Sequence, residues 1–164
     1  MIVTLEGFLG GGKSSVGREL SRRLGWDAYD LDAMIVQRES RSIAEIFEKE
    51  GEAYFRKVET QCLVNTLKLF DGGDLILSLG GGTPLHNAAL LREKTCCIWL
   101  RATPETIIRH IGTSDPSRPL FGDDLRERLA ERTPFYEAAA TFVVDVDGKR
   151  AGQVADEILA LINK

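Results

Sequence analysis

The sequence predicts an α/β fold, with helices covering both faces of a parallel sheet. Short apolar segments alternate with segments of helical spacing along the chain, as is typical of buried parallel strands and their crossover helices. The chain has 164 residues, 43% of them hydrophobic, which suits one compact domain spanning 1–164. Seven of its sixteen glycines lie in two groups, Gly7 with Gly10 to Gly12, and Gly80 to Gly82. Such clusters mark places where backbone closely approaches something else.

Five short segments are expected to form the strands. They are Ile2 to Leu5, a segment ending at Asp30, Leu75 to Leu79, Cys96 to Leu100, and Phe142 to Val146.

The expected helices follow from spacing and capping. Ser14 to Leu24 has helical spacing, and Ser42 to Glu45 is a capping box that opens a helix ending at Gly51. A longer helix then runs to about Phe70, and Thr103-Pro104-Glu105 starts another. The closing helix has Val154, Ile158, Leu161 and Ile162 at core spacing. The polar stretch at 112–124 is too long for an ordinary connection, and we expect it to move.

The charge balance and cysteine content exclude several classes of protein. The net charge is −4, whereas dedicated nucleic-acid binders are usually basic, so we expect no nucleic-acid partner. Apolar stretches are far shorter than a bilayer requires, and the N-terminus does not resemble a signal peptide, so no membrane partner is expected. Three cysteines are too few for a disulfide framework, which favours a reducing cytoplasm.

The first glycine group forms a phosphate-binding pattern between a strand and a helix. Gly7 to Ser14 match G-x-x-x-x-G-K-[ST], in which the backbone N–H groups of Gly10, Gly11 and Gly12 cradle phosphate oxygens. The helix that follows adds its positive dipole end. Lys13 neutralises charge on the β- and γ-phosphates, and the Ser14 hydroxyl is a Mg²⁺ ligand. We interpret this segment as a nucleoside triphosphate site.

Two carboxylates close the second expected strand, where parallel sheets bind their ligands. Asp30 is a candidate ligand of a hydrated metal ion, and Asp32 a candidate base for an acceptor hydroxyl. The alternative is an acidic loop that caps the next helix.

Further candidates for an anionic acceptor site are spread along the chain. Arg56 and Glu59 share one helix face, although by themselves they favour a solvated ion pair. Gly80 to Gly82 are either a ligand contact or a plain turn. Arg118 and Arg132, the latter at the end of the next helix, carry planar forks suited to carboxylate or phosphate, or are surface charges. Together these residues predict a small-molecule kinase. They do not identify its acceptor.

In combination, these motifs resemble the shikimate kinase family. The resemblance runs from the first strand to about Asp147 and rests on seven motifs in order: Gly7 to Ser14, Asp30-Leu31-Asp32, Ser42 to Phe47, Gly51-Glu52 with Phe55-Arg56, Gly80 to Gly82, Arg118-Pro119-Leu120, and Arg132 with Pro134 and Tyr136. It implies a three-layer αβα P-loop kinase fold with a five-stranded parallel sheet, an acceptor-binding region at about 32–60 and a mobile lid at about 112–124.

The resemblance also implies a reaction and a role for each motif. The reaction is ATP- and Mg²⁺-dependent phosphorylation of the 3-hydroxyl of shikimate, a step toward chorismate and the aromatic amino acids. We expect the chain to act as a monomer. ATP phosphates are bound by the residues from Gly10 to Ser15. Arg118 is the lid residue that contacts ATP. Arg109 and Lys149 lie where the family contacts adenine. Shikimate is bound by Asp32, Arg56, Gly80, Gly81, Gly82 and Arg132.

Several departures from the family pattern, Glu6 among them, and two alternatives accompany this interpretation. Glu6 stands where the family usually has an apolar residue, and an acid there repels phosphate unless it is directed away. One alternative is a kinase of another polyol or sugar acid, such as gluconate, which has no need for the set of Asp32, Arg56 and Arg132. The other is a catalytically silent nucleotide-binding module, which the loss of Lys13, Asp32 or the arginines would favour.

Overall fold

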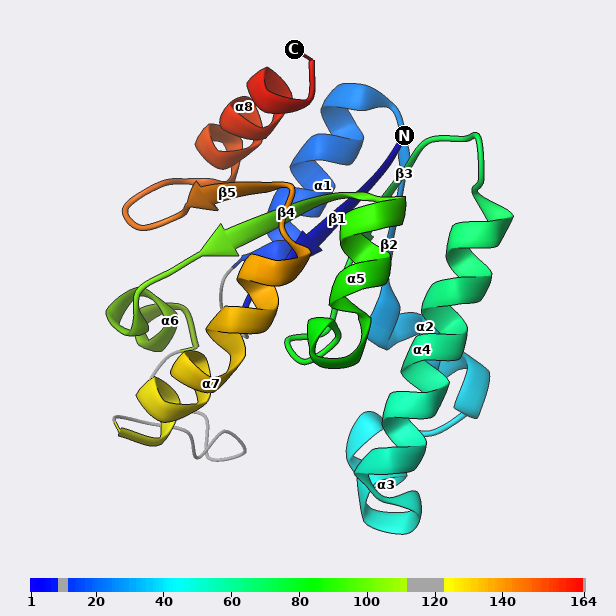
Figure 1. Ribbon diagram of the computed structural model, residues 1–164. Helices are drawn as coiled ribbons and strands as arrows, with labels where there is room; N and C mark the ends of the chain where they lie inside the picture. Colours follow the sequence, from blue (N-terminus) through cyan, green and yellow to red (C-terminus); the bar gives the residue numbers. More distant parts are fainter. Residues whose placement is uncertain (9–11, 112–122, 164) are drawn as a thin grey trace.

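The computed structural model describes residues 1–8, 12–111 and 123–163, and its centre is a five-stranded parallel sheet (Figure 1). The strand order is β2-β3-β1-β4-β5, and every neighbouring pair is parallel. The predicted fold class is thereby confirmed. The strands are β1 (Ile2–Glu6), β2 (Asp27–Asp30), β3 (Leu75–Ser78), β4 (Cys96–Arg101) and β5 (Phe142–Asp145).

Helices lie on both faces of this sheet. On one face α1 packs against α8, while α5 and α7 pack together on the other (Figure 1). The helices are α1 (Lys13–Leu24), α2 (Leu31–Glu39), α3 (Ile43–Glu50), α4 (Glu52–Leu69), α5 (Pro84–Lys94), α6 (Pro104–Ile111), α7 (Asp123–Ala139) and α8 (Ala151–Ile162).

Alternation along the strands divides the core between the two faces. Ile76 packs in the cluster that α1 and α8 cover, while its neighbours Leu75 and Leu77 pack in the cluster built with α2, α4 and α5. Successive strand side chains point to opposite faces, so continuous apolar strands require helices on both. The apolar runs of the sequence are explained by this burial.

The predicted elements match the observed ones closely, with two omissions and one correction. The sequence reasoning did not place α2 or α5, because each buries only a few residues and shows little apolar periodicity: Leu31 and Ile35 in α2, and Pro84, Asn87 and Leu91 in α5. The prediction that Arg132 ends its helix is wrong, because α7 continues through Pro134 to Ala139. The predicted lid at 112–124 lies outside the described residues, apart from the two that open α7.

The strand ends place polar side chains at one edge of the sheet. Because parallel strands end on the same side, Glu6, Asp30 and Ser78 lie along the edge from which α1 and α2 begin. None of the described helices has the length and apolar character needed to cross a membrane.

Candidate active site

The loop between β1 and α1 needs glycine at both of its described ends. A Cβ on Gly7 would lie 2.8 Å from the carbonyl oxygen of Leu100, and the φ of Gly7 is +155°. Gly12 has a left-handed φ of 86° where it precedes α1. The N-terminus of α1 therefore opens directly from this loop, as the phosphate-binding prediction requires. Gly10 and Gly11 lie outside the described residues.

Lys13, the first residue of α1, turns back over the loop. Its Nζ donates hydrogen bonds to the carbonyl oxygens of Gly7 at 2.6 Å and Phe8 at 3.3 Å. Burial lowers the pKa of Lys13 to about 8, while the charges of Asp32 and Asp30 act in the opposite direction. The amine therefore stays positively charged at neutral pH, and it stands near the carboxylates that close β2.

One cavity, of about 450 Å³, lies on the α8 side of the loop, and we call it the nucleotide cavity. Of the predicted nucleotide-binding residues, Gly12, Ser15 and Lys149 line it; the other lining residues are Val16, His110, Val146, Ala151 and Val154. Ser14 is exposed in the first turn of α1. Arg109 is exposed and is not a lining residue, because the step to His110 rotates the side chain by about 100° around the helix.

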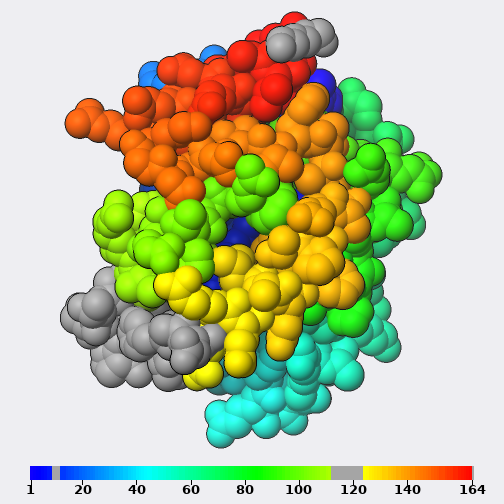
Figure 2. All heavy atoms as spheres, turned by 60° about the vertical axis from the view of Figure 1, so that its left-hand side comes forward, coloured from blue at the N-terminus to red at the C-terminus, as the bar shows by residue number. Residues whose placement is uncertain are grey.

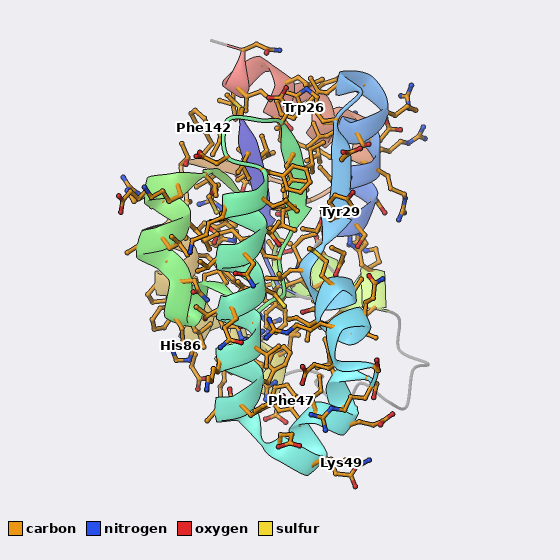
Figure 3. All side chains as sticks on the ribbon, turned by 90° about the vertical axis from the view of Figure 1, so that its right-hand side faces the viewer. Trp26, Tyr29, Phe47, Lys49, His86 and Phe142 are labelled. Atoms are coloured by element: carbon orange, nitrogen blue, oxygen red, sulfur yellow. The ribbon has the colours of Figure 1, made fainter. Side chains whose placement is uncertain are left out.

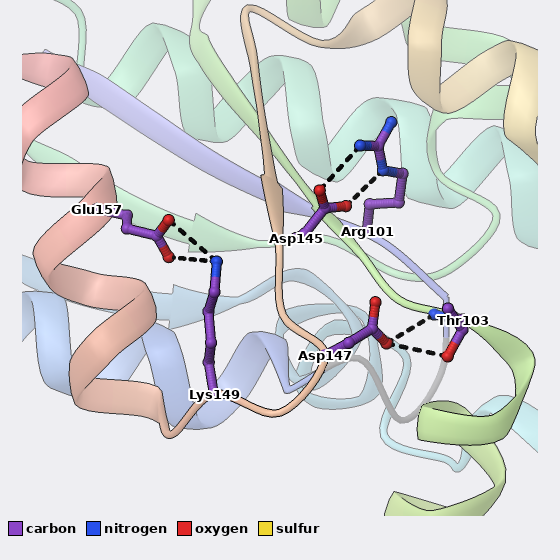
Figure 4. A network of polar contacts seen from close by, with 6 residues as sticks. All are labelled: Arg101, Thr103, Asp145, Asp147, Lys149 and Glu157. Carbon is purple, nitrogen blue, oxygen red and sulfur yellow. Dashed lines mark hydrogen bonds and ion pairs between the residues drawn. The ribbon is translucent and has the colours of Figure 1, made fainter.

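The loop that carries Lys149 is anchored by polar contacts (Figure 4). Asp147 accepts hydrogen bonds from the N–H and the hydroxyl of Thr103, each at 3.0 Å. Lys149 itself makes a two-oxygen ion pair with Glu157 of α8 at 2.8 and 3.0 Å. These contacts fix the far wall of the nucleotide cavity, and they hold the Lys149 amine against α8.

A second cavity, of about 240 Å³, lies on the other side of the loop, and we call it the acceptor cavity. All six predicted acceptor residues line it, although they come from four separate parts of the chain. Its lining residues are Phe8, Asp32, Ile43, Phe47, Phe55, Arg56, Glu59, Gly80, Gly81, Gly82, Arg128 and Arg132.

Asp30 and Asp32 behave differently at the mouth of this cavity. Asp30 caps α2, since its Oδ1 accepts a hydrogen bond from the N–H of Ala33 at 3.0 Å, so the capping alternative is realised at this residue. Asp32 is half-buried, and burial followed by the charges of Asp30 and Glu59 raises its pKa to about 6. It is still ionised at neutral pH, so it is able to accept a proton.

Arg56 and Glu59 are not a solvated ion pair, which corrects the expectation from helical spacing alone. Glu59 is only 1% exposed, and its Oε1 accepts a hydrogen bond from Arg56 at 2.7 Å. Its Oε2 accepts one from the hydroxyl of Thr83 at 2.9 Å. Arg56 Nε is buried and has no hydrogen-bond partner in the described part of the chain. Glu59 therefore fixes the guanidinium at the cavity wall.

The second glycine group forms the floor of the acceptor cavity. A Cβ on Gly80 would lie 2.8 Å from Oδ1 of Asp32, and one on Gly82 would lie 2.8 Å from an Arg56 guanidinium nitrogen. The side chains of Asp32 and Arg56 therefore approach the backbone of this turn closely. A residue with a Cβ at Gly80 or Gly82 would displace them. The turn therefore has a packing reason for glycine and also lines the acceptor cavity.

Arg132 and two phenylalanines complete the cavity. Arg132 projects from α7 and lies over the ring of Phe8, with its guanidinium carbon 5.4 Å from the ring centroid. Phe47, labelled in Figure 3, lies between α3 and α4 with its ring 4.8 Å from that of Phe55. The cavity therefore combines three guanidinium groups, two carboxylates and an aromatic wall. Arg118 lies outside the described residues.

Glu6 is the last residue of β1, directly before the phosphate loop. It pairs with Trp99 across the sheet, is fully buried, and neither carboxylate oxygen meets a hydrogen-bond partner in the described chain. Burial raises its pKa to about 8, an effect that the nearby Cys97 thiol and the charge of Lys13 reduce. Glu6 is therefore neutral at pH 7, which removes the expected repulsion of phosphate.

Sequence reasoning did not assign functional positions to several of these residues. No short sequence pattern marks His110 or Thr83. The cavity position of His110 depends on the rotation of its helix, and the contact of Thr83 depends on the placement of the distant Glu59. Tyr136 appears in the sequence only as part of a motif, yet its hydroxyl contacts the glycine turn.

Comparison with known proteins agrees with this geometry. The sequence model of the family described as "Shikimate kinase" matches residues 9–163. A shikimate kinase of Moorella thermoacetica is 40% identical over 162 residues, covering 95% of this chain and 91% of that protein. One of Geobacter metallireducens is 40% identical over 163 residues, covering 95% and 88%.

Solved structures give the same result. The structure of shikimate kinase from Acinetobacter baumannii in complex with shikimate superposes with a TM-score of 0.87 at 30% identity, covering 99% of this chain and 92% of that one. Shikimate kinase from Aquifex aeolicus gives 0.86 at 33% identity, with 99% and 96% covered. A family match over nearly the whole chain, joined to a phosphate loop flanked by a nucleotide cavity and an arginine-lined acceptor cavity, means that this chain belongs to the shikimate kinase family.

Proposed function

We propose that this chain transfers the γ-phosphate of ATP to the 3-hydroxyl of shikimate, and that the two cavities hold the two substrates. One observation carries the proposal: Arg56 and Arg132, 76 positions apart, line a single cavity with Asp32 beside the phosphate loop. Two guanidinium groups suit the carboxylate of shikimate, because each offers a planar pair of donors. The ionised Asp32 suits a hydroxyl that must lose its proton.

ATP would lie across the loop, with its base toward the nucleotide cavity and its γ-phosphate toward Lys13. Gly12, Ser15 and the N-terminus of α1 would bind phosphate oxygens, and Lys149 would stand beside the nucleoside. Lys13 would shift from its loop carbonyls to the β- and γ-phosphates. By the family resemblance alone, we assign Gly10, Gly11 and Arg118 as phosphate contacts. We assign Arg109 as an adenine contact that reaches in from outside the cavity wall.

The residues at the loop fit Mg²⁺. The exposed Ser14 hydroxyl and the Asp30 oxygen that does not cap α2 are hard oxygen donors, and Mg²⁺ usually takes few protein ligands alongside phosphates. When bound, Mg²⁺ neutralises charge on the phosphates undergoing transfer. Ser14 would bind it directly, and Asp30 would hold its hydration shell.

Catalysis would depend on positioning and charge rather than on a covalent intermediate. Arg56, fixed by Glu59, and Arg132 would orient the shikimate ring, while the Gly80 to Gly82 turn supports it from below. Asp32 would accept the hydroxyl proton as the oxygen attacks phosphorus, and Lys13 would stabilise the developing negative charge. All described residues in these roles come from one chain, so we expect an active monomer. We also expect a cytoplasmic location, where ATP is available.

The decisive experiment is a coupled assay of ADP release with a panel of acceptors. We expect release that requires shikimate and Mg²⁺ and that gluconate does not support. Asp32→Asn should lower kcat by at least about a hundredfold while shikimate still binds, because general-base assistance is worth about 10²–10⁴-fold. Val36→Ala, an exposed substitution on the same helix, is the matched control. ATP and shikimate binding without turnover would instead indicate a silent module.

A further inference from the structure

The hydroxyl of Tyr136 makes a contact for which the reaction described above has no use. It donates a hydrogen bond of 2.6 Å to the carbonyl oxygen of Gly81, across 55 positions of sequence. Tyr136 lies on α7, one helical turn beyond Arg132, and its side chain is fully buried. The contact therefore joins the helix that carries one acceptor arginine to the floor of the acceptor cavity.

The ring of Tyr136 is held in place from behind. Its centroid lies 5.7 Å from that of Trp99 on β4, which is itself buried. Figure 2 shows α7, in yellow to orange, on the same face of the molecule as α6 and β5. A pocket lined by Trp99, Leu129 and Thr133 lies beside the ring. Packing on Trp99 holds the Tyr136 ring so that its hydroxyl points at the glycine turn. Removal of that hydroxyl would leave the Gly81 carbonyl unpaired.

Fixing one carbonyl also fixes the donor behind it. A trans peptide is planar, so the N–H of Gly82 points opposite to the carbonyl of Gly81. With that carbonyl directed at Tyr136, the N–H is directed away from α7. The same turn also supports Asp32 at Gly80 and the Arg56 guanidinium at Gly82. A small rotation of this one peptide would thus disturb three groups that face the acceptor.

We propose that Tyr136 is a positioning residue for the acceptor: its hydroxyl holds the Gly81–Gly82 peptide so that the Gly82 N–H and the supported Arg56 side chain face shikimate. The inference rests on the proposed function, since shikimate is taken as the ligand of the acceptor cavity. It adds a residue that touches no substrate but sets the geometry of several that do.

The test is Tyr136→Phe, which keeps the ring and its packing on Trp99 and removes only the hydroxyl. Its matched control is Tyr54→Phe, which removes a hydroxyl that is hydrogen-bonded to Glu39 at 2.6 Å outside both cavities. Steady-state kinetics give kcat and both KM values, calorimetry gives the Kd for shikimate, and thermal unfolding reports the fold of each variant.

We expect Tyr136→Phe to raise the KM and Kd for shikimate about fivefold to tenfold, the loss of one buried hydrogen bond. The kcat and the KM for ATP should stay within about twofold of the unchanged protein, as should all constants of Tyr54→Phe. Unchanged shikimate constants in Tyr136→Phe would overturn the inference. Comparable changes in kcat, both KM values and the Kd, accompanied by a loss of folded protein, would overturn it too. Failure of the unchanged protein to phosphorylate shikimate would instead refute the proposed function.

Discussion

At the scale of single residues, the acceptor cavity depends on a glycine, which leaves space because it has no side chain. Gly82 has no Cβ, and one placed there would lie 2.8 Å from one Arg56 nitrogen and 2.9 Å from the guanidinium carbon. Its φ is not left-handed, so alanine would meet no backbone strain there. The requirement for glycine at this position is therefore a matter of space for the arginine.

Gly82→Ala should raise the KM for shikimate about tenfold or more, because Arg56 would have to leave the position from which it makes a charge-assisted hydrogen bond. The KM for ATP should hardly change. Gly73→Ala is the matched control, since its Cβ would lie an ordinary 3.4 Å from the carbonyl oxygen of Phe70, far from the cavity. Equal effects of the two substitutions on the shikimate KM would contradict this account of the floor.

At the scale of elements, strand β1 carries an acid into the interior. Alternation places Val3 and Leu5 in the cluster that α1 and α8 cover, so Glu6 faces the other side of the sheet, opposite Trp99. The burial that raises its pKa from 4.5 to about 8 is imposed by this strand register. A side chain that is charged in the unfolded chain at neutral pH is therefore protonated in the folded one.

This difference predicts a pH dependence of stability. Between pH 4.5 and 8 the folded state binds more protons at Glu6 than the unfolded state, so the free energy of unfolding falls as pH rises. The contribution is fully present below pH 4.5 and is lost as pH rises through about 8. Glu6→Gln should flatten this decline and stabilise the protein at pH 7.5 relative to pH 5, as measured by urea denaturation across this window.

The control for this prediction is Glu93→Gln, because Glu93 is exposed. It should leave the slope of stability against pH unchanged. The measurement stops at pH 8, since Lys13, whose pKa is lowered to about 8, contributes a slope of the opposite sign above that value. A Glu6→Gln protein with the same slope as the unchanged one would mean that Glu6 is ionised in the folded state.

At the scale of the whole molecule, two cavities lie on opposite sides of the phosphate loop, and the proposed function assigns one substrate to each. The nucleotide cavity is built from α1, α6, α8 and the loop before α8. The acceptor cavity is built from α2, α3, α4, α7, the glycine turn and Phe8 of the phosphate loop. No lining residue is shared between them. This division suggests that binding defects on the two sides can be separated.

Substitutions on the two sides should give opposite kinetic patterns. Arg132→Ala should raise the KM for shikimate about tenfold to a hundredfold, the worth of a charge-assisted hydrogen bond, with little change in the KM for ATP. Lys149→Ala should raise the KM for ATP by a smaller factor, because its amine is also held by Glu157, and leave that for shikimate unchanged. Steady-state kinetics with each substrate varied in turn distinguishes these outcomes, and equal changes in both KM values would argue against separate sites.

The sequence by itself determined the features whose causes are local. The phosphate loop, the five strands and the cap at Ser42, whose hydroxyl accepts from the N–H of Glu45 at 3.1 Å, follow from residue types at short spacing. The motif order also identified the family, and the family match over residues 9–163 confirmed it.

Only the tertiary structure decided what lies beside what. Spacing could not tell whether Arg56 and Glu59 were solvated, because their burial depends on Thr83 and the glycine turn reached from β3. Nor could it show that Tyr136 meets Gly81, or that His110 rather than Arg109 lines the nucleotide cavity. Helix and strand patterns act over a few residues, whereas cavities form where the sheet brings distant segments together, and there desolvation and neighbouring charges set the chemistry of each side chain.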